Sequence, residues 1–156
     1  MIWSKRKARA EAFFAPCLRG RLALHRTSFR AGYDLAARAW ITFEGHTIWE
    51  CRTPRVDPEE AEPFGPPRDS NDETRLAPSD FDAGVAAYPD LSIDDALSSP
   101  LVLARALSLL DARTGKRRLL ACDPNGFAHS VERTMFALRL RAEGLRLTDP
   151  RPLSSF

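Results

Sequence analysis

Residues 38–51 read RAWITFEGHTIWEC, and their pattern decides the fold predicted for this chain. Two runs of β-branched and aromatic residues flank Glu44 and Gly45, which is typical of a hairpin with a two-residue turn. This turn would pair Phe43 with His46, Thr42 with Thr47, Ile41 with Ile48 and Trp40 with Trp49. Matched residues meet at three of these four rungs, and a slip of one residue would destroy the match. We expect Ile41, Phe43 and Ile48 on one face, and Trp40, Thr42 and Trp49 on the other.

The residues before the hairpin predict a third strand and a helix. Residues 20–30, GRLALHRTSFR, have the mixed pattern of a half-exposed strand, with a possible bulge where the alternation breaks between Leu24 and Phe29. The first residues, WSKRKARAEAFFAP, predict a short amphipathic helix capped by Ser4. The first part of the chain is therefore expected to form an N-terminal helix and a small antiparallel sheet of about three strands.

The second half of the chain has helical periodicity. Ser92 and Ser99 are expected to cap two helices, and Gly115 is expected to close the second of them in a left-handed turn. A last helix with apolar residues at Val131, Met135, Leu138 and Ala142 should end at Gly144. These patterns predict an α+β protein, with residues 1–156 forming a single domain whose C-terminal half is helical.

Composition excludes several classes of protein. No apolar run is long enough to cross a membrane, and nothing resembles a secretory signal, so a cytoplasmic location is expected. Cys17, Cys51 and Cys122 are far apart and form no C-x-x-C pair, which disfavours a disulfide framework or a zinc site. Reduced, mostly buried thiols are expected, and no metal or cofactor is indicated.

The formal net charge of +2 conceals an uneven distribution of charge. Residues 57–95 carry 12 acids and two arginines, and the rest of the chain has 21 cations and nine acids. Within the acidic part, residues 54–79 hold six prolines, which predicts a long loop that could be partly disordered. This loop is either a solvated insertion or an internal mimic of phosphate that covers a basic face.

Residues 110–120, LDARTGKRRLL, raise the question of phosphate binding. A P-loop needs a glycine five positions before the Gly-Lys pair and a Ser or Thr after the lysine, but Leu110 and Arg117 occupy those positions. Two interpretations remain. Lys116, Arg117 and Arg118 could lie at the negative end of a helix that Gly115 closes. They could instead gather with Arg19, Arg21, Arg26 and the N-terminal KRKAR into one phosphate-binding face.

The leading functional hypothesis is a non-enzymatic binding or accessory module whose basic face meets a nucleic acid or another polyanion. Its candidate binding residues are Arg21, His25, Lys116, Arg117 and Arg118. A second hypothesis is a protein-partner module of regulatory or antitoxin-like type, which would use the Trp side of the hairpin and the acidic loop. A third is an enzyme with His25 as a base and Asp111 or Glu44 as its orienting acid. No catalytic residue is assigned, and the oligomeric state stays open.

Several stretches together resemble a family of small uncharacterised prokaryotic proteins. They are WSKRK at the start, LRGRLALHRTSFR, RAWITFEG in the hairpin, and ALSLLDARTGKRRL toward the C-terminal end. The resemblance covers both ends of the chain and leaves out the Pro- and Asp-rich middle. It implies no activity, and it marks Gly20, Arg21, His25, Trp40, Asp111, Gly115, Lys116 and Arg117 as residues that fit the family pattern.

Overall fold

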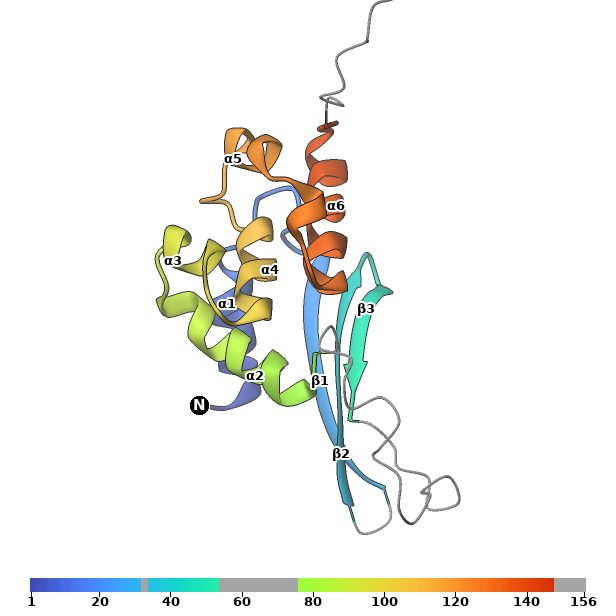
Figure 1. Ribbon diagram of the computed structural model, residues 1–156. Helices are drawn as coiled ribbons and strands as arrows, with labels where there is room; N and C mark the ends of the chain where they lie inside the picture. The colour runs from blue at the N-terminus through green and yellow to red at the C-terminus, as the bar shows by residue number, and fades with distance from the viewer. Residues whose placement is uncertain (32–33, 54–75, 148–156) are drawn as a thin grey trace, which may run out of the picture.

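Three antiparallel strands in the order β1–β2–β3 form the sheet of this computed structural model, which describes residues 1–31, 34–53 and 76–147. The strands are β1 (Leu22–Ala31), β2 (Asp34–Phe43) and β3 (His46–Arg52). The helices are α1 (Trp3–Glu11), α2 (Pro78–Ala87), α3 (Ile93–Leu97), α4 (Val102–Leu110), α5 (Lys116–Ala121) and α6 (Ser130–Glu143), with short 3-10 turns η1 (Tyr88–Asp90) and η2 (Pro124–Gly126). The N-terminal helix, the three-stranded sheet and the helical second half confirm the predicted α+β domain (Figure 1).

The β2–β3 hairpin turns at Glu44 and Gly45, as predicted. Both residues have positive φ, 51° and 82°, as a two-residue turn of this hand requires. Phe43 pairs with His46 and Thr42 with Thr47. The two outer rungs of the prediction are wrong, because a bulge at Ile48 makes Ile41 pair with Trp49 and Trp40 with Glu50.

The bulge places the two hairpin tryptophans on opposite faces of the sheet. Trp49 turns toward the helices and stacks on Phe81 of α2, with ring centroids 6.1 Å apart. Trp40 lies on the other face, stacked on His25 with centroids 5.0 Å apart. The register of the outer rungs is therefore set by the contact of Trp49 with Phe81 of α2, a helix distant in sequence. It is not set by pairing of like residues across the hairpin.

β1 pairs with β2 over ten consecutive residue pairs, so the bulge expected within β1 is absent. The break in alternation comes from Arg26, a charged side chain at a helix-facing position. Its Nε and Nη2 donate to the carboxylate oxygens of Asp82 on α2, each at 2.9 Å. A charge pair with α2 thus accommodates the break without any change of register.

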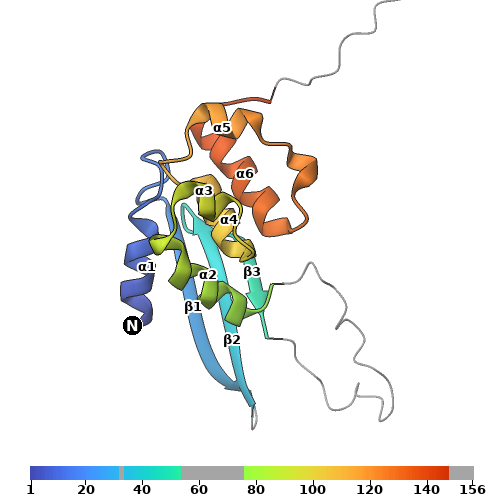
Figure 2. The same ribbon diagram turned by 60° about the vertical axis from the view of Figure 1, so that its left-hand side comes forward.

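The described helices all lie on one side of the sheet (Figures 1 and 2). α4 is the central helix, since most of its side chains are buried. α2 crosses it closely at Gly84, where an added Cβ would lie 2.6 Å from Cβ of Leu103. α1 runs beside the edge strand β1, and Glu11 Oε1 accepts a hydrogen bond from the edge N–H of Leu24 at 2.8 Å. A carboxylate thus satisfies a backbone donor that sheet pairing leaves open.

Two hydrophobic clusters hold these layers together. The larger one lies between the sheet and α1, α2 and α4, and contains Phe14, Leu24, Ile41, Phe81 and Leu107. The smaller one lies among α4, α5 and α6, and its buried members are Leu109, Leu119, Phe136 and Leu140. The second cluster is therefore a separate apolar contact that attaches α5 to the rest of the domain.

Several helix boundaries differ from the prediction. α1 begins after Ile2 without a side-chain cap, so Ser4 lies inside the helix. Ser92 caps α3 as expected, accepting a hydrogen bond from Asp95 N at 3.1 Å. Ser99 lies three residues before the first residue of α4 and is not the predicted cap, because the N-cap is Leu101; Ser99 Oγ accepts a hydrogen bond from Leu101 N. α6 ends at Gly144 in the left-handed conformation, as predicted.

The largest errors concern α2 and Gly115. α2 begins at Pro78, so Pro78 and Ser79 are helical and not part of the predicted loop 54–79, of which residues 54–75 lie outside the described residues. Gly115 has φ −74° and ψ 166°, an extended conformation, and it precedes α5 rather than closing α4. Lys116, Arg117 and Arg118 therefore form the first turn of a helix and lie at the positive end of its dipole.

Within the described ranges, no helix is both long and apolar enough to cross a membrane.

Candidate functional site

The segment between α4 and α5 is anchored to the chain that follows α1. Asp111 forms an isolated antiparallel bridge with Phe14. In this bridge, Ala112 N donates to Phe13 O and Ala15 N donates to Leu110 O, both at 2.8 Å. Two stretches almost a hundred residues apart in sequence are thereby joined through their backbones.

The side chain of Asp111 is fully buried and fully bonded. Arg113 donates to it from Nη2 at 2.7 Å and from Nε at 3.1 Å, and the backbone N–H of Arg113 donates at 2.7 Å. The hydroxyl of Tyr88, in η1, donates to the same carboxylate. Burial, together with the charge of Asp111, raises the pKa of Tyr88 and keeps its phenol protonated as a donor.

Arg139 of α6 closes the end of α4. Its guanidinium donates to the backbone oxygens of Leu109, Asp111 and Thr114, at 3.1, 2.8 and 2.9 Å. The last carbonyls of a helix lack hydrogen-bond donors within the helix, and here the guanidinium of a buried arginine donates to carbonyls at and just beyond the helix end. This is why α4 ends without a left-handed glycine. We call the set Tyr88, Asp111, Arg113, Thr114 and Arg139 the Asp111 junction.

Glu143, at the end of α6, connects the Asp111 junction to the surface. Its carboxylate accepts from Arg139 Nε at 3.0 Å and from Cys17 Sγ at 3.4 Å, and it lies 3.9 Å from Lys116 Nζ. Burial raises the pKa of Glu143, but the hydrogen bonds from Cys17 and Arg139 outweigh it and lower the pKa below its ordinary value. One carboxylate thus holds the loop before β1, the start of α5 and the end of α6 together.

Exposed cations belong to the three segments that meet here: Figure 1 shows the loop before β1, α5 and the end of α6 at the same end of the molecule. We call them the basic end: Arg19, Arg21, Lys116, Arg117, Arg141 and Arg146. Among the described residues, the only carboxylates bonded to this set are Glu44 and Glu143. Six cations thus stand against two bonded acids, which leaves a surplus of positive charge at this end.

The predicted binding residues occupy three different places. Arg21 and Lys116 both belong to the basic end, and they are linked because Cys17 O accepts from Arg21 Nη1 at 3.0 Å while Cys17 Sγ donates to Glu143. Arg21 also pairs with Glu44 at 2.5 Å. Arg117 forms no hydrogen bond or ion pair with any residue that the structure describes. Arg118 points away from them and pairs with Asp94 of α3 at 2.9 Å.

His25 lies within β1, about 13 Å along the strand from Arg21. Its Nε2 is 2.8 Å from Thr42 Oγ1, and its ring stacks on Trp40. Burial lowers the pKa of His25, the charge of Lys7 lowers it further, and Glu11 opposes both. His25 is therefore a partly buried, neutral strand residue.

The contact of His25 with Asp111 or Glu44 that the enzyme hypothesis requires is absent from the described residues. Asp111 is bonded to Tyr88 and Arg113, and Glu44 is bonded to Arg21, so neither carboxylate orients the imidazole. The described residues also contain no group of three or more His, Cys, Asp or Glu side chains arranged to hold a metal ion. The Trp surface of the partner hypothesis is divided as well, since Trp40 and Trp49 face opposite ways.

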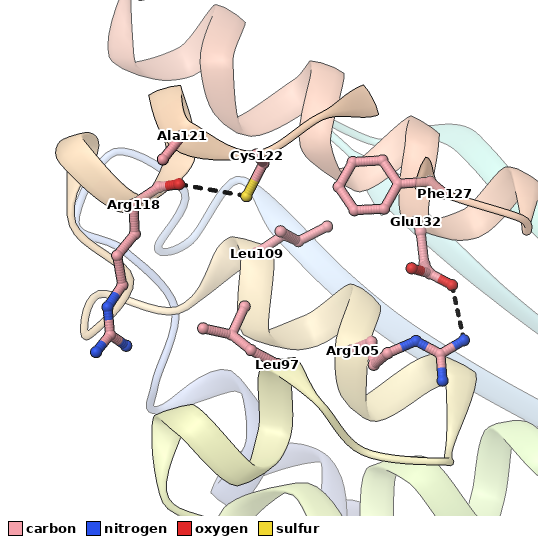
Figure 3. A pocket seen from close by; sticks show the side chains of 8 residues that line it. All are labelled: Leu97, Arg105, Leu109, Arg118, Ala121, Cys122, Phe127 and Glu132. Carbon is pink, nitrogen blue, oxygen red and sulfur yellow. Dashed lines mark hydrogen bonds and ion pairs between the residues drawn. The ribbon is translucent and has the colours of Figure 1, made fainter. Parts of the chain in front are cut away.

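A pocket of about 320 Å³ opens beside the smaller hydrophobic cluster (Figure 3). Its lining residues come from α3, α4, α5 and the start of α6: Leu97, Arg105, Leu109, Arg118, Ala121, Cys122, Phe127 and Glu132. Glu132 is buried and accepts from Arg105 Nη2 at 2.9 Å. We call this the Glu132 pocket.

Sequence reasoning missed Tyr88, Arg139 and Glu143. For Arg139 a signal existed, because it follows Met135 by four residues and Val131 by eight, inside the apolar stripe of α6. A charge at such a position must find buried partners. The three free cysteines were expected as buried thiols, and Cys51 is buried whereas Cys17 and Cys122 are partly buried.

Comparison with known proteins identifies a family and nothing closer. No curated protein and no solved structure matches the chain. The model of the SF0329 protein family matches residues 2–140, a range that runs through the middle segment left out of the resemblance. No activity is known for this uncharacterised family. Because the match covers most of the 156 residues, the chain belongs to the SF0329 protein family.

Proposed function

We propose that this protein is a binding module that contacts the phosphate backbone of a nucleic acid through the basic end. The observation that carries the proposal is the contact of Cys17 and Lys116 with one partly buried carboxylate, Glu143. This contact joins the loop before β1, the start of α5 and the end of α6, the three segments that carry these cations. Arg21 is bonded to the same loop through Cys17 O.

The bonding pattern supports a role beyond folding for part of this set. Arg117, Arg141 and Arg146 form no ion pair with a described residue, so their charge is available to a ligand. Arginine matches phosphate with a planar fork of donors, which suits backbone contact without readout of bases. The expected ligand is therefore recognised by charge and shape rather than by sequence.

The test is fluorescence anisotropy with mixed-sequence DNA and RNA at increasing salt. If all six cations contact phosphate, the slope of log K against log salt approaches about −5. Replacing Lys116, Arg117 and Arg141 by alanine together should reduce the steepness of the slope by about one unit per lost contact.

A matched control removes the same charge elsewhere. Lys5, Arg6 and Arg30 lie outside the basic end, and none of them pairs with a described acid. Their triple alanine variant should bind almost as the wild type does. Equal weakening by both triple variants, or no binding by the wild type at low salt, would contradict the proposal.

A further inference from the structure

The Glu132 pocket has apolar walls and is independent of the basic end. Leu97 of α3 and Leu109 of α4 lie on one side, and Cys122 and Phe127 lie on the α5–α6 side (Figure 3). Its volume of about 320 Å³ falls at the lower end of the range for small-molecule sites, about 300–1,000 Å³. It adjoins the smaller hydrophobic cluster, so a bound apolar group would extend that cluster.

One hydrogen-bond acceptor remains open in the pocket. The side chain of Glu132 is only 6% exposed, and its Oε1 accepts from Arg105. Its Oε2 accepts no hydrogen bond from the described residues. Every fully buried side-chain oxygen among those residues has a partner, so Oε2 is not fully buried. Oε2 therefore keeps some accessible surface, and because Glu132 lines the pocket, a ligand donor can meet it there.

The charge of the pocket selects the kind of donor. Arg105 already neutralises Glu132, and its Nη1 is held by the backbone oxygen of Ser99 at 2.6 Å. A cationic ligand would face the Arg105 guanidinium at close range, whereas a neutral N–H or O–H adds a hydrogen bond without adding charge. A neutral donor is the better match.

The walls select an aromatic body for that donor. Phe127 is held edge-to-face against Phe136, with centroids 5.2 Å apart, so its ring is fixed in place at the pocket wall. Aromatic rings pair favourably with such a ring, and the Cys122 sulfur is a favourable neighbour for a π-system. We propose that the Glu132 pocket binds a small aromatic molecule with one neutral hydrogen-bond donor, of the indole or phenol class.

The entrance does not obstruct such a ligand. Arg118 and Asp94 pair at 2.9 Å between α5 and α3, with 46% and 78% of their side chains exposed. An exposed pair of this kind contributes little to stability and can open. Arg118 thus belongs to the pocket, and the alanine variants that test the basic end leave it unchanged.

The decisive comparison uses indole and benzothiophene, which share a shape but differ in the N–H donor. Calorimetry should show indole binding about tenfold more tightly or better, because a hydrogen bond to a charged acceptor is lost with benzothiophene. Amide shifts in ¹H–¹⁵N spectra should be confined to the residues around the pocket. Equal affinity for the two probes, or shifts centred elsewhere, would overturn the proposal.

A variant that fills the pocket provides the second test. Cys122→Phe should abolish indole binding, and Leu120→Phe, on the exposed side of α5, should preserve it. Alkylation of the wild-type protein, followed by mass spectrometry, tests the proposal without any substitution. Indole should slow modification of Cys122 and leave that of Cys17 unchanged. If Cys122 is not protected, the ligand does not occupy this pocket.

Discussion

Two halves of one short motif behave in opposite ways in this protein. In DARTG, residues 111–115, the side chains of Asp111 and Thr114 are buried and Arg113 is bonded to Asp111. In KRR, residues 116–118, all three side chains are exposed, and their ion pairs are long or lie on the surface. Residues that are adjacent in sequence thus hold the fold together in the first half and lie exposed on the surface in the second.

The difference shows that burial, and not residue type, decides what an arginine does. Arg139 is 3% exposed and bonded to three carbonyls and Glu143, while Arg117 is exposed and bonded to no described residue. A buried guanidinium is retained only where every donor has a partner. An exposed one keeps its hydration and its charge for a partner molecule. The following substitutions test this contrast.

The largest effect is expected from Asp111→Ala. It removes the buried carboxylate that accepts from the buried Tyr88 hydroxyl and from the partly exposed Arg113. Hydrogen bonds to a charged group contribute about 1.5–3 kcal/mol each, so the expected loss is about 3 kcal/mol or more. Urea denaturation followed by circular dichroism measures the loss. Asp94→Ala is the control, because its exposed pair with Arg118 should contribute less than about 1 kcal/mol. If Asp111→Ala and Asp94→Ala lower the free energy of unfolding by similar amounts, the contrast between the buried first half and the exposed second half of the motif is wrong.

Arg139→Met is expected to have the next largest effect. Methionine keeps the apolar stem but removes the donors to Leu109 O, Asp111 O and Thr114 O, which lowers the free energy of unfolding by about 2–3 kcal/mol. Arg141→Met, on the exposed side of α6, should change it by no more than about 0.5 kcal/mol. If the two variants are equally stable, the carbonyls at the end of α4 do not depend on Arg139.

A much smaller effect is expected from replacing Lys116 and Arg117 by alanine together. Lys116 is 63% exposed and 3.9 Å from its partner, and cations in the first turn of a helix oppose its dipole. The free energy of unfolding should change by no more than about 0.5 kcal/mol, as measured by the urea midpoint. A loss above about 2 kcal/mol would show that this half of the motif also serves the fold.

The smallest effect is expected from the titration of Glu143, which joins the two regions. Its folded pKa lies below the ordinary value of 4.5, so the folded state favours the charged carboxylate. That stability is complete above the unfolded pKa and is lost as the pH falls through the folded pKa. Glu143→Gln should flatten the acid limb of the stability curve. If the stability curves of the wild type and Glu143→Gln run parallel at acid pH, protonation of Glu143 does not contribute to the loss of stability.

Local patterns predicted the features that depend on a few neighbouring residues. The Glu44–Gly45 turn, the Ser92 cap and the left-handed end of α6 at Gly144 all follow from side-chain or backbone chemistry within about four residues. α2 also carries local signals that the prediction missed: Pro78 at its first position, and Asp80, whose Oδ2 accepts from Ala77 N at 3.0 Å. Its buried residues Phe81, Gly84 and Val85 have helical spacing, but the close approach of Gly84 to Leu103 of α4 depends on packing.

For the candidate site, the sequence supplied part of the residues and none of the geometry. Arg21 and Lys116 were expected to converge, and the contacts through Cys17 and Glu143 bring them to the same end. Arg118, Arg26 and the N-terminal cations were expected there as well. Arg118 pairs with Asp94 of α3, Arg26 pairs with Asp82 of α2, and α1 begins away from this end (Figure 1). His25, the remaining candidate, lies within β1. The Glu132 pocket could not be foreseen, because its walls come from four separate elements.

The sequence by itself determined the class of fold, the hairpin turn and the N-terminal helix, since alternation, turn residues and helical periodicity act over short distances. The tertiary structure alone decided the bulge at Ile48, the extended Gly115 and the burial of Asp111. Trp49 needs Phe81 of α2, and the end of α4 needs Arg139 of α6. These partners lie about 30 residues away in the chain, and only packing brings them into contact.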